Sequence, residues 1–268
     1  MQSSEGKGRT SKAESRADRI LHELQRNRSV SIADLCSILD ISVATARRDL
    51  QSLENQGLLR RTHGGAVLLE PLFYEAFRHD SSFQEQIERH AEEKRRIALA
   101  AAEMVRDGET IALTAGTTTT EVVRSIRNRS GVTVVTSTIN VAMELTKRKD
   151  LEVFVTGGFL RGDWFSLVGP AANYAMSQIN MDKAFLGVNG IDAEKGLTSA
   201  NNGEAAINRV IVNQAKQRIV VADRSKLGAV ATYRFCGCNE IHVLITDAAA
   251  DDAAIAPFEA LGIEVKRV

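Results

Sequence analysis

Cysteine and proline are scarce in this sequence, which has three of each among its 268 residues. Three cysteines are too few, and odd in number, to form a disulfide framework, so they are typical of a protein in a reducing compartment. Cys236 and Cys238 are separated by one glycine, but no second Cys/His pair follows at zinc-ligand spacing. We therefore interpret Cys36, Cys236 and Cys238 as packing thiols, and we expect neither a metal site nor a cofactor.

Long apolar segments are also absent. No apolar run reaches the ~18 residues of a membrane-spanning helix, and residues 1–16 lack the apolar core of a secretion signal. We therefore expect a cytoplasmic protein that has no membrane partner. The composition, 44% hydrophobic and 25% charged, excludes disordered and collagen-like chains. At roughly 150 residues per domain, the length predicts two domains.

An excess of one charge is the third feature that is missing, because Lys plus Arg and Asp plus Glu number 34 each. Net charge therefore says nothing about a nucleic-acid partner. The distribution is uneven, since residues 1–65 contain eleven basic and eight acidic side chains. This asymmetry is informative only if the basic residues lie on one face.

Three short helices and a hairpin are predicted near the N-terminus. Capping residues Ser31 and Ser42 each precede a segment with helical apolar spacing, and Gly57 ends the last of these segments. Two strand-like runs, 58–62 and 66–69, flank the glycines at 64 and 65. The helices are expected at 18–26, 32–39 and 43–56, which gives the outline of a winged helix-turn-helix.

The third helix has two different faces. At 100° per residue, one face is an apolar stripe and the opposite face is small and basic. A generic helical bundle with solvated arginines is the alternative, but the short turn before this helix and the arginines on the hairpin favour DNA binding. The buried stripe is expected to contain Val43, Ala46, Leu50 and Leu53, and the opposite face Thr45, Arg48 and Ser52.

The segment Ser42-Val-Ala-Thr-Ala-Arg-Arg-Asp-Leu50, followed by Arg61-Thr-His-Gly-Gly-Ala66, resembles the DNA-binding domain of the DeoR family of bacterial transcriptional regulators. The resemblance implies that the third helix enters the major groove of operator DNA. Arg47 and Arg48 are the expected base or phosphate contacts, whereas the Asp49 carboxylate would be repelled by phosphate and is interpreted as structural. The candidate DNA-binding residues are Ser42, Val43, Ala44, Thr45, Arg47, Arg48, Gln51, Arg60, Arg61 and His63.

Strands and helices alternate from residue 94 onward, which predicts an α/β domain with a mostly parallel sheet and helices on both faces. We divide the chain into a flexible leader (1–14), a winged helix-turn-helix domain (15–69), a linker with helical sequence (70–93) and a sensor domain (94–268). Strands are expected at 110–113, 132–136, 151–156, 183–188, 218–222, 241–246 and 263–268, and helices at 94–106, 141–147, 171–179, 202–216 and 253–261.

Small polar residues follow several of these strands, where open parallel sheets bind their ligands. Gly116 and the threonines after it open a helix whose N-terminus suits a phosphate, although a threonine-rich cap alone is more often structural. Asp223 and Lys226 suit hydroxyls and an anion, and Glu204 either joins them or only complements a helix dipole. A phosphorylated sugar fits this chemistry. The candidate effector-binding residues are Thr114, Gly116, Thr117, Thr118, Thr119, Thr136, Ser137, Gly157, Gly158, Asn189, Glu204, Asp223 and Lys226.

The same region resembles the DeoR-type sensor domain, through Lys94-x-x-Ile97-Ala98, Gly116-Thr-Thr118, Asp182-x-Ala-Phe-Leu-Gly187 and Ala222-Asp223-x-Ser225-Lys226. With the first domain, the resemblance covers roughly residues 15–250. It implies a fold similar to ribose-5-phosphate isomerase, glucosamine-6-phosphate deaminase and coenzyme A transferases, and a role in sensing phosphorylated sugars or related metabolites. Two positions depart from the family pattern: Thr114 stands in place of aspartate, and Ser137-Thr138 in place of Asn-Ser.

We therefore expect a transcriptional repressor of a carbohydrate uptake or catabolism operon, relieved by a phosphorylated sugar and acting as a homodimer or homotetramer. The alternative is a sugar-phosphate isomerase or deaminase with an accessory DNA-binding domain. Asp223 and Glu204 are its only candidate acids or bases, and nothing nearby completes a catalytic set. We therefore assign no catalytic residues and expect no enzyme.

Overall fold

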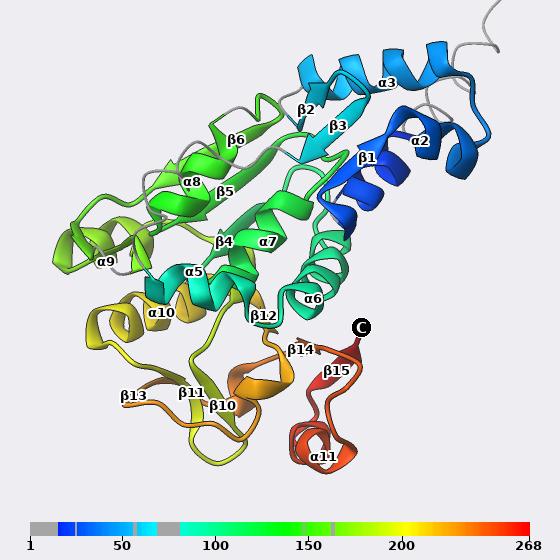
Figure 1. Ribbon diagram of the computed structural model, residues 1–268. Helices are drawn as coiled ribbons and strands as arrows, with labels where there is room; N and C mark the ends of the chain where they lie inside the picture. Colours follow the sequence, from blue (N-terminus) through cyan, green and yellow to red (C-terminus); the bar gives the residue numbers. More distant parts are fainter. Residues whose placement is uncertain (1–15, 25, 56–57, 69–80, 147, 162–163) are drawn as a thin grey trace, which may run out of the picture. The chain divides into compact units, whose positions relative to one another are not determined.

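The computed structural model describes residues 16–24, 26–55, 58–68, 81–146, 148–161 and 164–268 (Figure 1). These residues form two compact units, an N-terminal one ending at residue 68 and a C-terminal one that contains residues 81–146 and 150–268. The expected leader, residues 70–80 of the expected linker and Gly57 lie outside the described residues. Each unit is considered separately below.

The N-terminal unit is a winged helix-turn-helix, as the sequence predicts. Residues 16–24 are helical, and two further helices and an antiparallel sheet of order β1-β3-β2 follow. Strand β1 is missing from the sequence-based prediction, because its three residues include the cap of the next helix. The bounds are β1 (Ser29–Ser31), α2 (Ile32–Leu39), α3 (Val43–Asn55), β2 (Leu59–Thr62) and β3 (Gly65–Leu68).

Two serine caps set the turn between α2 and α3. Ser31 Oγ accepts a hydrogen bond from the Asp34 backbone N–H at 3.0 Å, and Ser42 Oγ accepts one from the Thr45 N–H at 3.2 Å. Asp40 ends α2 with φ 52°, in the left-handed region. Because α3 begins three residues after Asp40, the direction of α3 is fixed by this short connection.

The apolar stripe of α3 is shorter than predicted. Ala46, Leu50 and Leu53 of α3 are buried in the hydrophobic core of the N-terminal unit, but Val43 is 48% exposed. The prediction of a buried Val43 is wrong, because Val43 is the first residue of α3 and lies beyond the end of that core.

The C-terminal unit is built on a seven-stranded sheet of order β15-β14-β12-β9-β4-β5-β6, in which every strand pair is parallel. All seven strands were predicted, to within a few residues at their ends. Their bounds are β4 (Thr110–Leu113), β5 (Val132–Thr136), β6 (Leu151–Val155), β9 (Met181–Leu186), β12 (Ala215–Val221), β14 (Val243–Thr246) and β15 (Glu264–Arg267).

Alternate residues of the central strands point to two separate cores. Ile111 and Phe185 pack with helices α6, α7 and α8, whereas Ala112, Ala184 and Leu186 pack on the other face with α9, α10 and α11. The predicted covering of both faces is confirmed. The helices are α5 (Ser81–Glu88), α6 (Ala91–Glu103), α7 (Thr117–Ser125), α8 (Ile139–Leu145), α9 (Pro170–Ser177), α10 (Asn202–Gln214) and α11 (Asp252–Ala260).

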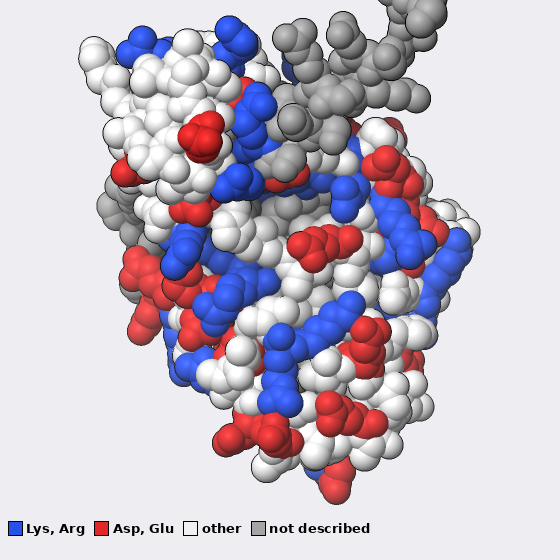
Figure 2. Space-filling model, turned by 90° about the vertical axis from the view of Figure 1, so that its right-hand side faces the viewer, with Lys and Arg blue, Asp and Glu red and all other residues white. Residues whose placement is uncertain are grey.

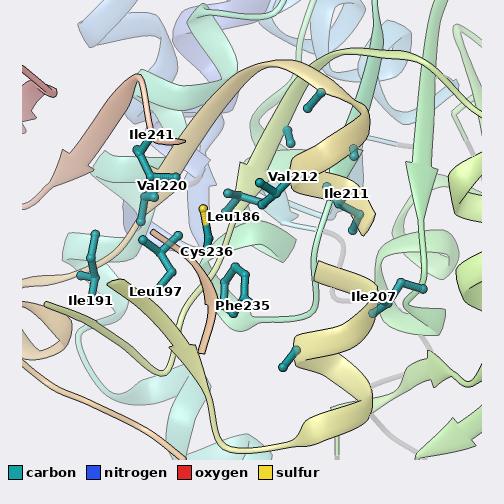
Figure 3. Close-up of a cluster of buried hydrophobic side chains, with 14 of the residues drawn as sticks. Leu186, Ile191, Leu197, Ile207, Ile211, Val212, Val220, Phe235, Cys236 and Ile241 are labelled. Atoms are coloured by element: carbon teal, nitrogen blue, oxygen red, sulfur yellow. The ribbon is translucent and has the colours of Figure 1, made fainter. Parts of the chain in front are cut away.

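A small antiparallel sheet of β10 (Gly190–Asp192), β11 (Gly196–Ser199) and β13 (Tyr233–Cys236), and a hairpin of β7 (Phe159–Arg161) and β8 (Ser166–Val168), were not predicted. Leu197 and Phe235 of the small sheet share one core with Leu186 of the large sheet (Figure 3). Cys236 and Cys238 are buried there as free thiols, and burial raises their pKa values to about 12 and about 11.

The adjacent glycines of the wing provide a matched test of the N-terminal unit. A Cβ at Gly65 would lie 1.9 Å from the Val30 carbonyl oxygen of β1, whereas a Cβ at Gly64 would have nothing within 4 Å. We expect Gly65→Ala to lower the free energy of unfolding of this unit by about 2–3 kcal/mol, and Gly64→Ala to change it by less than about 0.5 kcal/mol.

Urea unfolding followed by far-UV circular dichroism would measure this difference. Fluorescence of Trp164, the single tryptophan, reports on the C-terminal unit and should give the same transition in both variants. Equal stability of the two variants would contradict the close packing of β3 on β1.

Candidate functional site

The candidate DNA-binding residues lie on the surface of α3 and the wing. Except for Thr45, which is half-buried, all of them are exposed. An open groove between α3 and the wing is lined by residues of both, including Arg47, Glu54, Arg61 and His63. The N-terminal unit therefore presents the helix and the hairpin on a shared surface.

The wing is fastened to α3 by Arg61. Its guanidinium donates a hydrogen bond to the Gln51 side-chain oxygen, and its backbone N–H donates to Glu54 Oε1 at 2.9 Å. Arg61 and Gln51 therefore already have intramolecular roles. By contrast, the side chains of Arg47, Arg48 and Arg60 have no ion-pair or hydrogen-bond partner within the part of the chain that the structure describes.

Asp49 forms a two-point contact with the first helix. Arg16 Nε lies 2.9 Å from Asp49 Oδ2, and Arg16 Nη2 lies 3.3 Å from Oδ1. The hydrogen bond to Asp49 raises the pKa of Arg16. This geometry agrees with the structural role inferred for Asp49 from the sequence.

The C-terminal unit has a different surface. On the face shown in Figure 2, its Lys and Arg side chains lie between Asp and Glu side chains, in keeping with pairs such as Arg95 with Glu92 and Arg267 with Asp252.

A polar pocket of about 130 Å³ lies where β4, β9 and β12 end. In chain order, β4 is followed by β5 and β6 on one side, while β9, β12, β14 and β15 extend to the other. The order in which successive strands are added to the sheet therefore reverses between β4 and β9, although all the strands are parallel. Open parallel sheets bind ligands at such a reversal of strand order. Of the candidate effector-binding residues, the pocket is lined by Gly116, Thr117, Thr118, Asn189, Glu204, Asp223 and Lys226.

The start of α7 forms one wall of the pocket. Gly116 is the N-cap, with φ 149°, and the hydroxyls of Thr119 and Thr120 donate to its carbonyl oxygen at 2.9 and 2.8 Å. These bonds fix the turn between β4 and α7. Because the first N–H groups of a helix have no intrahelical acceptor, α7 offers them, with its positive dipole end, to an anion.

The loop after β12 brings Asp223 and Lys226 to the wall of the pocket. It contains a single 3-10 turn, η2 (Arg224–Lys226), whose Arg224 lies 2.7 Å from the buried Asp247 and 3.2 Å from Glu93 of α6. Burial alone would raise the pKa of Asp247, but hydrogen bonds from the Arg224 backbone and guanidinium lower it overall. The loop is therefore held in place by an ionised carboxylate.

Glu204 lines the pocket from the start of α10. Its carboxylate accepts hydrogen bonds from Ser166 at 2.8 Å and Ser199 at 3.4 Å, and its backbone N–H donates to Asn201. Glu204 therefore does more than complement the helix dipole.

The remaining candidate effector-binding residues do not line the pocket. The Thr114 hydroxyl is buried and accepts the Gly187 N–H at 2.8 Å, joining the ends of β4 and β9. The Thr136 hydroxyl donates to the Leu113 carbonyl oxygen. The candidate residues that follow β5 and β6 do not join this lining, because these two strands lie beyond β4, away from the point where the strand order reverses. The residues outside the lining are Thr114, Thr119, Thr136, Ser137, Gly157 and Gly158.

Lys94 is the most important lining residue that was not predicted as a site residue. It is only 4% exposed, and its Nζ donates to the carbonyl oxygens of Gln86 and, at 2.6 Å, Arg89. Burial lowers its pKa to about 8, although the charge of Asp223 opposes this shift. Lys94 precedes Ile97 by three residues and Ala98 by four, which places it on the buried face of α6. This spacing is the feature of the sequence that could have indicated a buried lysine.

Other unpredicted lining residues include Gln86, Trp164, Ser199 and Asn208. Among the residues that the structure describes, no group of three or more His, Cys, Asp and Glu side chains could hold a metal ion. No helix within those same ranges is long and apolar enough to span a membrane.

Comparisons with known proteins agree for both units. The family model described as DeoR-like helix-turn-helix domain matches residues 16–71, and that described as DeoR C terminal sensor domain matches residues 89–248. The HTH-type transcriptional regulator GlpR of Haloferax volcanii is 37% identical over 250 residues, which cover 93% of this chain and 96% of that protein. The HTH-type transcriptional repressor GlcR of Bacillus subtilis is 34% identical over 252 residues, or 94% and 95% of the two chains.

Among solved structures, ribose 5-phosphate isomerase A of Methanocaldococcus jannaschii aligns at 18% identity and a TM-score of 0.39, covering 51% of this chain and 54% of that one. The family matches, by contrast, cover the helix-turn-helix, six of the seven strands of the parallel sheet and every pocket-lining residue except Gln86. The chain therefore belongs to the DeoR family of DNA-binding transcriptional regulators.

Proposed function

We propose that this regulator represses a carbohydrate uptake or catabolism operon, and that a phosphorylated sugar binding in the pocket releases it from operator DNA. The observation that carries the proposal is the pocket at the point where the strand order reverses. The start of α7, Lys94 and Lys226 all line this pocket. The relative from Bacillus subtilis is named a repressor, which supports the sign of regulation.

The pocket has separate partners for the two halves of such a ligand. Two ammonium groups and a helix N-terminus favour a phosphate. The carboxylates of Asp223 and Glu204, with the side chain of Asn208, suit sugar hydroxyls. The size of the pocket suits a small polar metabolite better than a drug-sized ligand.

The same carboxylates support sensing instead of catalysis. Glu204 is held by two serine hydroxyls, and Asp223 accepts the Ser225 N–H at 3.0 Å. These bonds orient the two carboxylates as acceptors, and each oxygen keeps a second lone pair that can accept a sugar hydroxyl, so we assign them ligand binding and not proton transfer. A turnover assay with aldose and ketose phosphates tests this inference, and any catalysed isomerisation or deamination would contradict it.

Operator recognition is assigned to α3 and the wing. Arg47 and Arg48, exposed on α3, are proposed to reach base edges or phosphates in the major groove, and Arg60 and His63 to lie along the backbone or in the minor groove. One winged helix buries little surface, so we further propose a homodimer or homotetramer that binds paired half-sites. Light scattering on the purified protein tests the oligomeric state.

Arg48→Ala tests the DNA-binding surface. If Arg48 reads a base, operator affinity should fall by about 1–3 kcal/mol at fixed salt. Fluorescence anisotropy with an operator selected from random DNA by the wild-type protein would measure it. Lys195→Ala, at an exposed site of the C-terminal unit, is the control and should bind normally. Wild-type affinity in Arg48→Ala would remove this residue from the interface.

Lys226→Ala tests the pocket. A charge-assisted contact to phosphate contributes about 1.5–3 kcal/mol, so the variant should bind the operator normally but need roughly 10–100 times more sugar phosphate for release. Trp164 lines the pocket, so its fluorescence follows binding directly. A panel of phosphorylated aldoses and ketoses, with the unphosphorylated sugars as controls, supplies the ligands. Release at wild-type concentrations would show that Lys226 does not contact the effector.

A further inference from the structure

Lys94 joins the pocket to a neighbouring helix. Its side chain lines the pocket, and the same ammonium donates to the carbonyl oxygens of Gln86, in the last turn of α5, and Arg89, just after it. The last carbonyls of a helix have no intrahelical donor, and a cation placed there stabilises the helix end. Figure 1 shows α5 beside the start of α6, where Lys94 lies.

The ammonium group has a donor left for the pocket. Of its three N–H groups, two are directed to the α5 end. The charges that act on Lys94 are Asp223 and Glu121, which attract it, and Lys226 and Arg89, which repel it. Lys94 is therefore shared between neutral carbonyl acceptors on one side and a pocket built for an anion on the other.

Lys94 lies in the 13-residue helix α6, whereas α5 is a short helix of eight residues. The adjacent Glu93 is paired with Arg224, which anchors α6 to the loop that carries Asp223 and Lys226. In sequence, α5 is the first described element after residues 69–80, which connect the two units. A change at the end of α5 is thus close in the chain to the DNA-binding unit.

We propose that Lys94 transmits occupancy of the pocket to α5, an inference that rests on the proposed function. A phosphate is a stronger acceptor for an ammonium than a neutral carbonyl oxygen. When the pocket fills, the ammonium turns toward the anion, its bonds to the carbonyl oxygens of Gln86 and Arg89 weaken, and the last turn of α5 loosens. Lys94 is in this sense a positioning residue for α5 as well as a ligand contact.

Hydrogen–deuterium exchange of the full chain tests this directly, with inorganic phosphate as the probe and sodium chloride at equal ionic strength as the blank. Phosphate should speed exchange of the amides of residues 85–89 in the wild type by about two- to fivefold, the effect of losing a cation at a helix end. Trp164 fluorescence in the same samples establishes whether phosphate is bound.

Two variants separate the relay from a purely structural role. Lys94→Gln keeps a donor for the α5 carbonyls but has no charge, so α5 should exchange slowly both without phosphate and with saturating phosphate. Lys94→Met removes the donor too, so α5 should exchange quickly in both conditions. Lys195→Met, at an exposed site that does not line the pocket, is the matched control, and its α5 should respond to phosphate as in the wild type.

The possible failures are distinguishable. If phosphate does not bind to the wild type, the anion pocket of the proposed function is refuted, and this inference with it. If phosphate binds but exchange at α5 does not change, or Lys94→Gln responds as the wild type does, the relay is refuted while the proposed function stands.

Discussion

The parallel pairing of β4 with β9 is the contact on which the pocket depends. These two strands are separated by about 70 residues of chain but are neighbours in the sheet, with Ile111 opposite Lys183 and Leu113 opposite Phe185. Their ends are joined by the bond from Gly187 N–H to the Thr114 hydroxyl. The connections that leave the two strands run to opposite sides, so a gap remains between them, and the start of α7 and the loop after β12 line it.

Thr114, which joins the ends of β4 and β9, is a residue that departs from the family pattern. Where the family pattern noted above has aspartate, threonine supplies a neutral oxygen that accepts the Gly187 N–H. Because the hydroxyl is buried and already bonded, its effect on the ligand is through the strand ends that it joins. The charged groups that do line the pocket come from α6, α10 and the loop after β12.

Much of the sheet could be predicted from sequence, because buried parallel strands are short continuous apolar runs separated by helical spacing. The small sheet of β10, β11 and β13 could not, because glycine and polar residues interrupt these strands and leave no continuous apolar run. The order of the strands is also absent from the sequence. For that reason Gly157 and Gly158 were grouped with Asp223, although β6 and β12 lie far apart in the sheet.

Lys94 is a pocket residue that the sequence-based prediction of the site did not include. A lysine on an apolar helix face has an unfavourable burial energy, which lowers its pKa to about 8. The fold offsets part of this cost with the carbonyl oxygens of Gln86 and Arg89, and a bound anion would offset more. A buried cation that faces a polar pocket is a sign of ligand binding in a regulator as much as in an enzyme.

The central claim is that one ligand fills the pocket and releases DNA. Its most direct test follows Trp164 fluorescence and operator anisotropy together, in one sample, during titration with each phosphorylated sugar. The account predicts that one sugar phosphate changes both signals with the same midpoint, and that its unphosphorylated form changes neither. Release of DNA without a change at Trp164, or a filled pocket with DNA still bound, would contradict it.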